Sequence, residues 1–148
     1  MKEQKLIMRH NKICFAAIVL CVTGLFTVAS LPSASAAPPT PVTITAVYDF
    51  STFPNVTGTF TTTGALNISG TSTMHVDFNP NGVRAHCVVT LTASNGTIVI
   101  DQQCQFASSP PKGRWEIVGG TGAYANLNGN GSLTMPPNTE EMTGVIFQ

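Results

Sequence analysis

The chain has 148 residues, with seven basic and seven acidic side chains and a formal net charge of zero. Four of the basic residues lie within the first twelve positions, so the rest of the chain is mildly acidic, with six carboxylates against three cations. Nucleic-acid binding needs clustered Lys or Arg, and beyond the N-terminal segment only Lys112 and Arg114 lie close together. The composition therefore argues against nucleic acid as a partner.

Residues 1–36 have the three parts of a secretory signal peptide. A basic start at 1–12 is followed by an uncharged apolar run at 13–29 and by small polar residues that end in Ala-Ser-Ala at 34–36. The pattern predicts a helical signal peptide that is cleaved after Ala36, and hence a secreted, extracellular protein with no membrane segment after cleavage. An uncleaved membrane anchor is the alternative, because an apolar run of about 17 residues is near the lower length for a membrane span.

Removal of this segment leaves about 112 residues, enough for one domain with its own core but not for two. Residues 37–41 (APPTP) contain three prolines, which cannot donate to a sheet ladder, so we expect a flexible leader there and one domain over 42–148. Thr, Gly, Ser and Asn are abundant, as in disordered chains, but the alternating Val, Ile, Phe and Thr favour an ordered, half-buried pleated surface.

Short runs that alternate apolar and polar residues follow one another along this domain, separated by turn signals and without a helical period. In the first run, the residues from Val42 to Phe50 with even numbers are the apolar face. The predicted strands are 42–50, 56–63, 72–79, 83–92, 97–107, 114–118, 131–135 and 142–147. About eight short strands with short connections predict an all-β fold, either an antiparallel barrel or a sandwich.

The clearest hairpin joins the fourth and fifth of these strands through Asn95-Gly96, the dipeptide preferred in two-residue type I′ turns. A loop of these two residues places Cys87 directly opposite Cys104 on the apolar face. The pair falls at a non-hydrogen-bonded site, where Cα atoms are about 4.5 Å apart and a disulfide can form. An exported chain favours disulfides, so we predict a Cys87–Cys104 bridge, with two reduced core thiols as the alternative.

Candidate catalytic and metal-binding patterns are weak. His75 with Asp77, and Arg84 with His86, each share one strand face, but alternation places them opposite the apolar face and predicts that they are exposed. A metal site needs three or four convergent ligands, and no Gly-x-Ser-x-Gly or phosphate-binding glycine motif occurs. We therefore predict no catalytic residue, no cofactor and no metal.

The densest motif is Trp-Glu-Ile-Val-Gly-Gly-Thr-Gly-Ala-Tyr at 115–124, followed by Leu127 and Gly-Asn-Gly at 129–131. It resembles the strand–GGTGxY/F–loop–GxG signature of allene oxide cyclase barrel-like and dirigent proteins. Residues 56–60 and 96–100 are similar to strands of small secreted bacterial members of that family. The resemblance implies an antiparallel eight-stranded β-barrel with a central cavity, in agreement with the strand count.

Plant relatives in this family cyclise an unsaturated epoxide or steer the coupling of phenoxy radicals, and they often assemble as dimers or trimers. The polar residues that they use lie outside the signature and have no matched positions here. We therefore expect a non-catalytic secreted barrel, which binds a small apolar molecule or acts as a surface or interaction module, with homo-oligomers left open. The expected ligand contacts are Tyr48, Phe50, Phe78 and Trp115.

The alternative is a cyclase-like or dirigent-like enzyme, in which Asp49, Asp77 or Arg84 orients a hydrophobic substrate inside the barrel. Cavity geometry separates the two functions. An enzyme should have two or more inward polar groups around an open apolar pocket, whereas a barrel filled with side chains would eliminate ligand binding of either kind.

Overall fold

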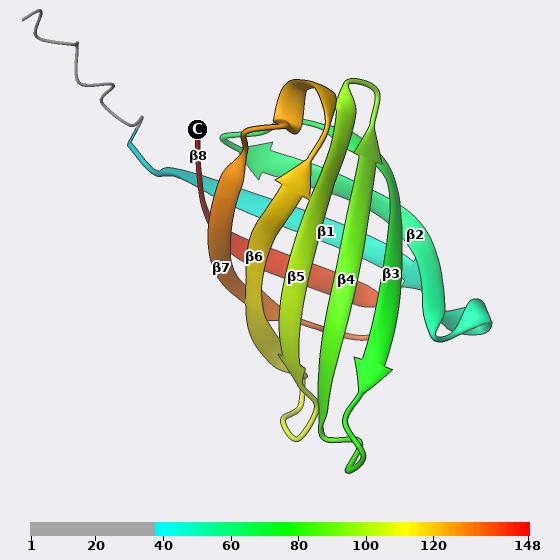
Figure 1. Cartoon of the computed structure of the whole chain (residues 1–148). Coiled ribbons are helices and arrows are strands. Elements are labelled where there is room, and N and C mark those ends of the chain that lie inside the picture. The colour runs from blue at the N-terminus through cyan, green and yellow to red at the C-terminus, as the bar shows by residue number, and fades with distance from the viewer. Residues whose placement is uncertain (1–37) are drawn as a thin grey trace, which may run out of the picture. The chain divides into compact units, whose positions relative to one another are not determined.

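Eight strands close into one antiparallel barrel in the computed structural model, which describes residues 38–148 (Figure 1). Each strand pairs with the next along the chain, and β1 pairs with β8 to close the ring. The strands are β1 Thr40–Asp49, β2 Asn55–Gly64, β3 Ser69–Phe78, β4 Arg84–Ala93, β5 Gly96–Gln105, β6 Lys112–Gly120, β7 Asn128–Thr134 and β8 Thr139–Phe147. The predicted all-β, eight-stranded barrel is confirmed, whereas the predicted signal peptide, residues 1–36, lies outside the described residues.

Two short 3-10 turns complete the elements: η1, Phe50–Thr52, between β1 and β2, and η2, Gly122–Tyr124, between β6 and β7. No helix within residues 38–148 is long and apolar enough to cross a membrane. β1 begins at Thr40, two residues before the predicted boundary, and Pro41 there still contributes its carbonyl oxygen, which accepts from the amide of Ala65 at 2.9 Å.

The core lies inside the barrel because the side chains alternate between its two faces. On β1, the even-numbered residues from Val42 to Tyr48 are buried and the residues between them are more exposed. The same alternation buries Met74 and Val76 on β3 and Val89 and Leu91 on β4. Each fully buried side chain of this size stabilises the fold by about 1.5–3 kcal/mol relative to exposure, so the inward face carries most of the stability.

The β4–β5 hairpin has a different register from the predicted one. Ala93 pairs with Gly96, so the two loop residues are Ser94 and Asn95, and the prediction of an Asn95-Gly96 loop was wrong. The cause is a tertiary contact. Gly96 has a φ of +146° and lies so close to the segment after β6 that a Cβ atom there would overlap the carbonyl oxygen of Thr121.

The Gly-Gly-Thr-Gly motif holds this hairpin tip in place. The amide of Thr97 donates to Thr121 Oγ1 at 3.0 Å, and the amide of Thr121 donates to the carbonyl of Thr97 at 2.9 Å. Tyr124 and Leu127, which follow the motif, are buried in the core cluster. Figure 1 shows η2 at the same end of the barrel as the β4–β5 turn, so this segment covers that end of the core.

The substitution Gly96→Ala should test this contact. We expect it to lower the free energy of unfolding by about 2 kcal/mol or more, because it combines an unfavourable φ with backbone overlap. The matched control is Gly82→Ala, since Gly82 also has a positive φ, +66°, but has no atom within 4 Å of its Cβ position; its loss should be about 1 kcal/mol. Urea denaturation measures both, and equal losses would contradict the contact with Thr121.

Candidate functional site

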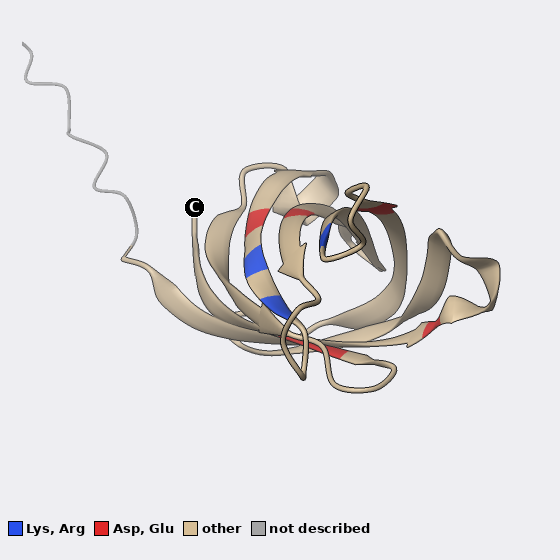
Figure 2. Ribbon diagram, turned by 90° about the horizontal axis from the view of Figure 1, so that it is seen from below, with Lys and Arg blue, Asp and Glu red and all other residues tan. Residues whose placement is uncertain are grey.

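A cavity of about 290 Å³ opens at the end of the barrel opposite the Gly-Gly-Thr-Gly segment. Its walls come from residues near the ends of β1 and β3, from Cys87 of β4 and from the first residues of β8. The connections after β1, β5 and β7 supply the rest of the lining. Figure 2 looks onto this end and shows the strands as a ring with few charged positions. The lining is mostly aromatic and aliphatic, including Met74, Val76, Met135 and Pro136.

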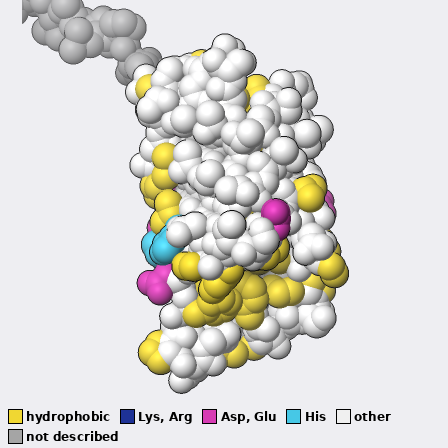
Figure 3. Space-filling model, turned by 90° about the vertical axis from the view of Figure 1, so that its right-hand side faces the viewer, with side chains coloured by type: hydrophobic (Ala, Val, Ile, Leu, Met, Phe, Trp, Pro, Cys, Tyr) yellow, Lys and Arg dark blue, Asp and Glu magenta, His cyan; other side chains and the backbone are white. Residues whose placement is uncertain are grey.

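Aromatic rings surround the mouth of this cavity. Phe50, Phe53 and Phe78 are 45%, 52% and 39% exposed, which is unusual for large apolar side chains on a protein surface. The ring centroid of Phe78 lies 5.0 Å from that of Phe106 and 6.1 Å from that of Phe53. Figure 3 shows a continuous hydrophobic patch on the lower part of the face it views. The mouth is therefore an apolar surface that is continuous with the cavity.

Three of the four residues predicted to contact a ligand lie around this cavity: Tyr48, Phe50 and Phe78. Trp115, the fourth, lies elsewhere in the barrel interior and is 2% exposed. Its Nε1 donates to the carbonyl of Ser132 at 3.0 Å. Its ring occupies space beside Gly131 and Gly144, where a Cβ atom would lie 2.8 and 2.6 Å from ring atoms, so Trp115 is a packing residue.

Glu140 is the acidic group of the cavity. It is 1% exposed, lines the cavity, and accepts a hydrogen bond at Oε2 from the hydroxyl of Tyr48 at 3.1 Å. Its other oxygen, Oε1, has no hydrogen-bond partner within residues 38–148. Burial raises the pKa of Glu140 to about 7, although the neighbouring Tyr48 hydroxyl and Gln102 amide act in the opposite direction. Glu140 is therefore poised to gain or lose a proton near neutral pH.

Other polar side chains line the barrel interior near Glu140. The amide of Gln102 is buried and donates to Met142 Sδ at 3.3 Å. Ser72 is also buried, and its hydroxyl has no partner in the described part of the chain. Burial, followed by the charge of Glu140, raises the pKa of Tyr48, which keeps that hydroxyl protonated. We call Tyr48, Ser72, Gln102 and Glu140 the inner polar cluster.

Glu140 and Gln102 were not predicted as site residues, although the sequence carries a signal for both. The last predicted strand began at Met142, whereas β8 begins at Thr139, and this extension puts Glu140 on the same face as Met142. Gln102 lies between Ile100 and Cys104 on the inward face of β5. Period-2 alternation alone would have placed both side chains inside the barrel.

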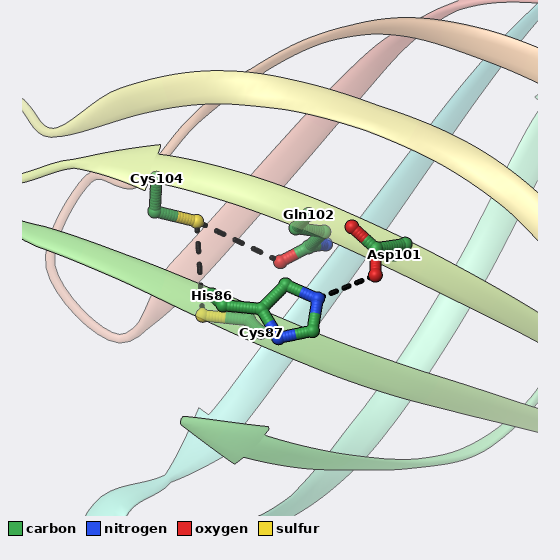
Figure 4. Close-up of polar contacts among 5 residues, drawn as sticks. All are labelled: His86, Cys87, Asp101, Gln102 and Cys104. Atoms are coloured by element: carbon green, nitrogen blue, oxygen red, sulfur yellow. Dashed lines mark hydrogen bonds and ion pairs between the residues drawn. The ribbon is translucent and has the colours of Figure 1, made fainter. Parts of the chain in front are cut away.

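Cys87 and Cys104 both face the interior but are not directly opposite each other. Cys87 pairs with Gln102, and Cys104 pairs with Ala85, so the two cysteines are diagonal neighbours. Their Sγ atoms are 3.7 Å apart, and Cys104 Sγ lies 3.9 Å from Gln102 Oε1 (Figure 4). A disulfide has an S–S distance of about 2.05 Å, so the two thiols are free. Contact with Cys87 and burial raise the pKa of Cys104, which disfavours its reactive thiolate form.

The polar residues of the outer face do not enter the cavity. His75, Asp77, Arg84 and His86 are exposed, as alternation predicted. Asp49 is exposed too, and the backbone amide of Ser51, which donates to its carboxylate at 2.9 Å, lowers its pKa. The hypothesis that Asp49, Asp77 or Arg84 orients a substrate inside the barrel was therefore wrong, because all three lie on its outer face or rim.

Two histidines on this outer face each form a polar contact with a neighbouring side chain. His86 Nε2 is hydrogen-bonded to Asp101 Oδ2 (Figure 4), and His75 Nδ1 lies 2.7 Å from Asn55 Oδ1. Within residues 38–148, no group of three or more His, Cys, Asp or Glu side chains is placed to hold a metal ion. Each histidine thus has a local polar partner on the barrel wall.

No protein-family model matches the chain, and no curated protein is found to be similar to it.

The raised pKa of Glu140 predicts a pH-dependent stability. A carboxyl group whose pKa is higher in the folded state stabilises the fold at low pH, and that stability is lost as the pH rises from 4.5 to about 7. The shift from 4.5 to about 7 corresponds to about 3 kcal/mol. We expect the free energy of unfolding of the wild type to fall over this range by about that amount relative to Glu140→Gln.

The control for this measurement is Glu141→Gln, which removes the exposed neighbouring carboxylate and should keep the wild-type pH profile. Denaturant titrations at pH 4.5, 6, 7 and 8 give the three profiles. Parallel profiles for the wild type and Glu140→Gln would show that the carboxyl of Glu140 ionises normally in the folded protein.

Proposed function

We propose that this protein is an exported barrel that binds a small apolar molecule in the cavity at its open end. The supporting observation is the cavity itself, which joins an apolar interior to an aromatic rim. Its volume of about 290 Å³ lies at the lower end of the range of about 300–1,000 Å³ that ligand pockets span. A compact ligand of one or two rings suits it better than a long lipid.

The lining also indicates how such a ligand would lie. Its apolar body would pack between the Phe50, Phe78 and Phe106 rings, where it would cover side chains that are partly exposed to water. Its inner end would then approach Glu140 and Tyr48, two buried polar groups that line the cavity wall. An apolar pocket with a few convergent polar groups is the usual form of a small-molecule site.

The sequence motif at 115–124 supports membership of the allene oxide cyclase barrel-like group as part of this proposal. The Gly-Gly-Thr-Gly segment makes hydrogen bonds with the β4–β5 hairpin and covers one barrel end, a structural role that leaves the other end available for a ligand. Since one fold hosts many functions, membership of this group would support the barrel fold more strongly than it would support any particular reaction.

An acid–base enzyme of the cyclase type is a second candidate, and the inner polar cluster is the observation that favours it. Glu140 and Tyr48 are two inward polar groups beside an open apolar cavity, and a carboxyl group with a pKa of about 7 can donate or accept a proton at neutral pH. Binding and catalysis differ in the fate of the ligand. A bound molecule recovered unchanged after incubation supports the binding protein, and an isomerised one supports the enzyme.

The cavity can be tested by blocking its mouth. Met135 is half-buried and lines the cavity, so Met135→Trp should fill the entrance and weaken binding of the neutral, fluorescent two-ring probe 1-naphthylmethanol by about tenfold or more. Val118→Trp is the control, because Val118 is 58% exposed on β6 outside the cavity, and it should bind the probe like the wild type. Probe titration followed by fluorescence measures both, and equal weakening, or none, would rule out this cavity as the site.

Export and the Cys87–Cys104 bridge form the last part of the proposal. The basic, apolar and small-residue regions of 1–36 support export. The inward thiols, whose sulfur atoms are 3.7 Å apart, are close enough to join after modest side-chain and backbone adjustment. A bond between these neighbouring strands would lock β4 to β5 beside the cavity.

Intact mass spectrometry of the full-length chain, produced in an exporting bacterial host and recovered from the medium, tests both points. We expect a mature chain that begins at Ala37 and has lost two hydrogens, which a reductant restores. The variant Cys87→Ser/Cys104→Ser should show the same N-terminus and no change on reduction. A full-length mass would contradict cleavage, and an unchanged mass on reduction of the wild type would contradict the bridge.

A further inference from the structure

We infer that the cavity selects a hydrophobic amine, whose ammonium group pairs with the carboxylate of Glu140 while its apolar body occupies the aromatic mouth. This inference rests on the proposed ligand-binding function and names the chemical class of the ligand. It draws on three observations: an unpaired buried carboxylate oxygen, the charge of the cavity lining, and the apolar side chains that line the cavity between its mouth and Glu140.

The first observation is that only one of the two carboxylate oxygens of Glu140 has a hydrogen-bond partner. Tyr48 donates to Oε2 at 3.1 Å, but Oε1 is buried and has no hydrogen-bond partner in the described barrel. The Gln102 amide donates one N–H to Met142 Sδ and lies near enough to Glu140 to lower its pKa, but it makes no hydrogen bond of good geometry with Oε1. A buried carboxylate oxygen without a donor is unfavourable, so a ligand that brings an N–H or O–H group to Oε1 gains a hydrogen bond that the barrel does not itself provide.

The second observation concerns charge. Among residues 38–148, no Lys, Arg or His lines the cavity, and Glu140 is the one carboxyl group of its lining. An ionised carboxylate in an apolar interior needs an opposite charge. Burial raises the pKa of Glu140 to about 7, so below that pH a proton neutralises the carboxylate. A ligand ammonium group can replace that proton.

Charge distinguishes an amine from the other head groups that would fit. An alcohol can donate to Oε1 but leaves the carboxylate without a counter-charge. A ligand carboxylate is repelled by ionised Glu140 and has no cation to pair with in the cavity. An ammonium group supplies both the donor and the charge, and hydrogen bonds between charged partners are stronger than neutral ones.

The apolar path limits the rest of the ligand. Phe50, Phe53 and Phe78 flank the entrance, and Met74 and Val76 line the wall. A hydrophilic amine would lose hydration on this path without gaining apolar contacts. An aromatic or compact aliphatic body attached to the amine gains those contacts, so the preferred ligand is amphipathic, with one cationic end.

Proton exchange provides a signature of this pairing. The titratable groups that face the Glu140 region are Tyr48 from β1, Cys87 from β4 and Cys104 from β5. Burial raises the pKa of Tyr48, and contact with Cys87 raises that of Cys104, so both stay neutral at neutral pH. Below pH 7, an amine must displace the proton of Glu140, and its affinity should fall as the pH is lowered.

The experiment compares three ligands with one skeleton: 1-naphthylmethylamine, 1-naphthylmethanol and 1-naphthoic acid. Isothermal titration calorimetry with the wild type, Glu140→Gln and Glu141→Gln gives their affinities at pH 7.5 and 5.5. At pH 7.5, we expect the wild type to bind the amine about tenfold or more tighter than the alcohol, and the acid most weakly. Its affinity for the amine should fall about tenfold or more at pH 5.5, whereas that for the alcohol stays constant.

The variants assign these effects to one side chain. Glu140→Gln should lose the preference for the amine and its pH dependence but keep binding the alcohol, which shows that the cavity is intact. Glu141→Gln should behave like the wild type. Because Glu140→Gln retains Tyr48 and both cysteines, a pH dependence that persists in it belongs to those groups and overturns the inference.

Failure of the inference and failure of the proposed function look different. If the wild type binds the alcohol and the amine equally, the selection of amines is wrong and the apolar binding site stands. If the amine preference persists in Glu140→Gln, Glu140 is not its partner and the inference is wrong. If none of the three naphthalenes binds, the inference and the proposed binding function both fail.

Discussion

The closing ladder between β1 and β8 is the constraint on which the rest of the structure depends. It pairs Ala46 with Glu140 and continues over eight residues of each strand, so that every strand has a neighbour on both sides. A closed sheet has no free edge, and its side chains must point either into the barrel or away from it. This choice puts Glu140 inside the barrel, where it meets a tyrosine hydroxyl from a strand 92 residues away in sequence.

The two ends of the barrel differ in how they are closed. At one end, Thr97 and Thr121 exchange hydrogen bonds and Tyr124 and Leu127 fill the core. At the other, the connections carry Phe50, Phe53 and other apolar side chains that leave a cavity between them. Hydrogen bonds thus hold the segment after β6 over one end of the barrel, and the cavity opens at the other end.

Local patterns predicted much of this barrel, and long-range contacts decided the rest. Alternation placed Tyr48 inside and His75 and His86 outside, because it depends only on the strand period. The β4–β5 register could not be predicted from Asn95-Gly96, since contact with Thr121 moves the loop by one residue. The cavity residues lie on different strands. The sequence contains no motif that indicates where the inward side chains leave a space between them.

The position of Trp115 makes its fluorescence informative about folding. Trp115 is the chain's single tryptophan, and it lies between glycines of β7 and β8, away from the cavity lining. Indole emission depends on the surroundings of the ring, so emission from this residue reports whether the last strands are closed around it. The protein thus carries an intrinsic fluorescent reporter of barrel folding.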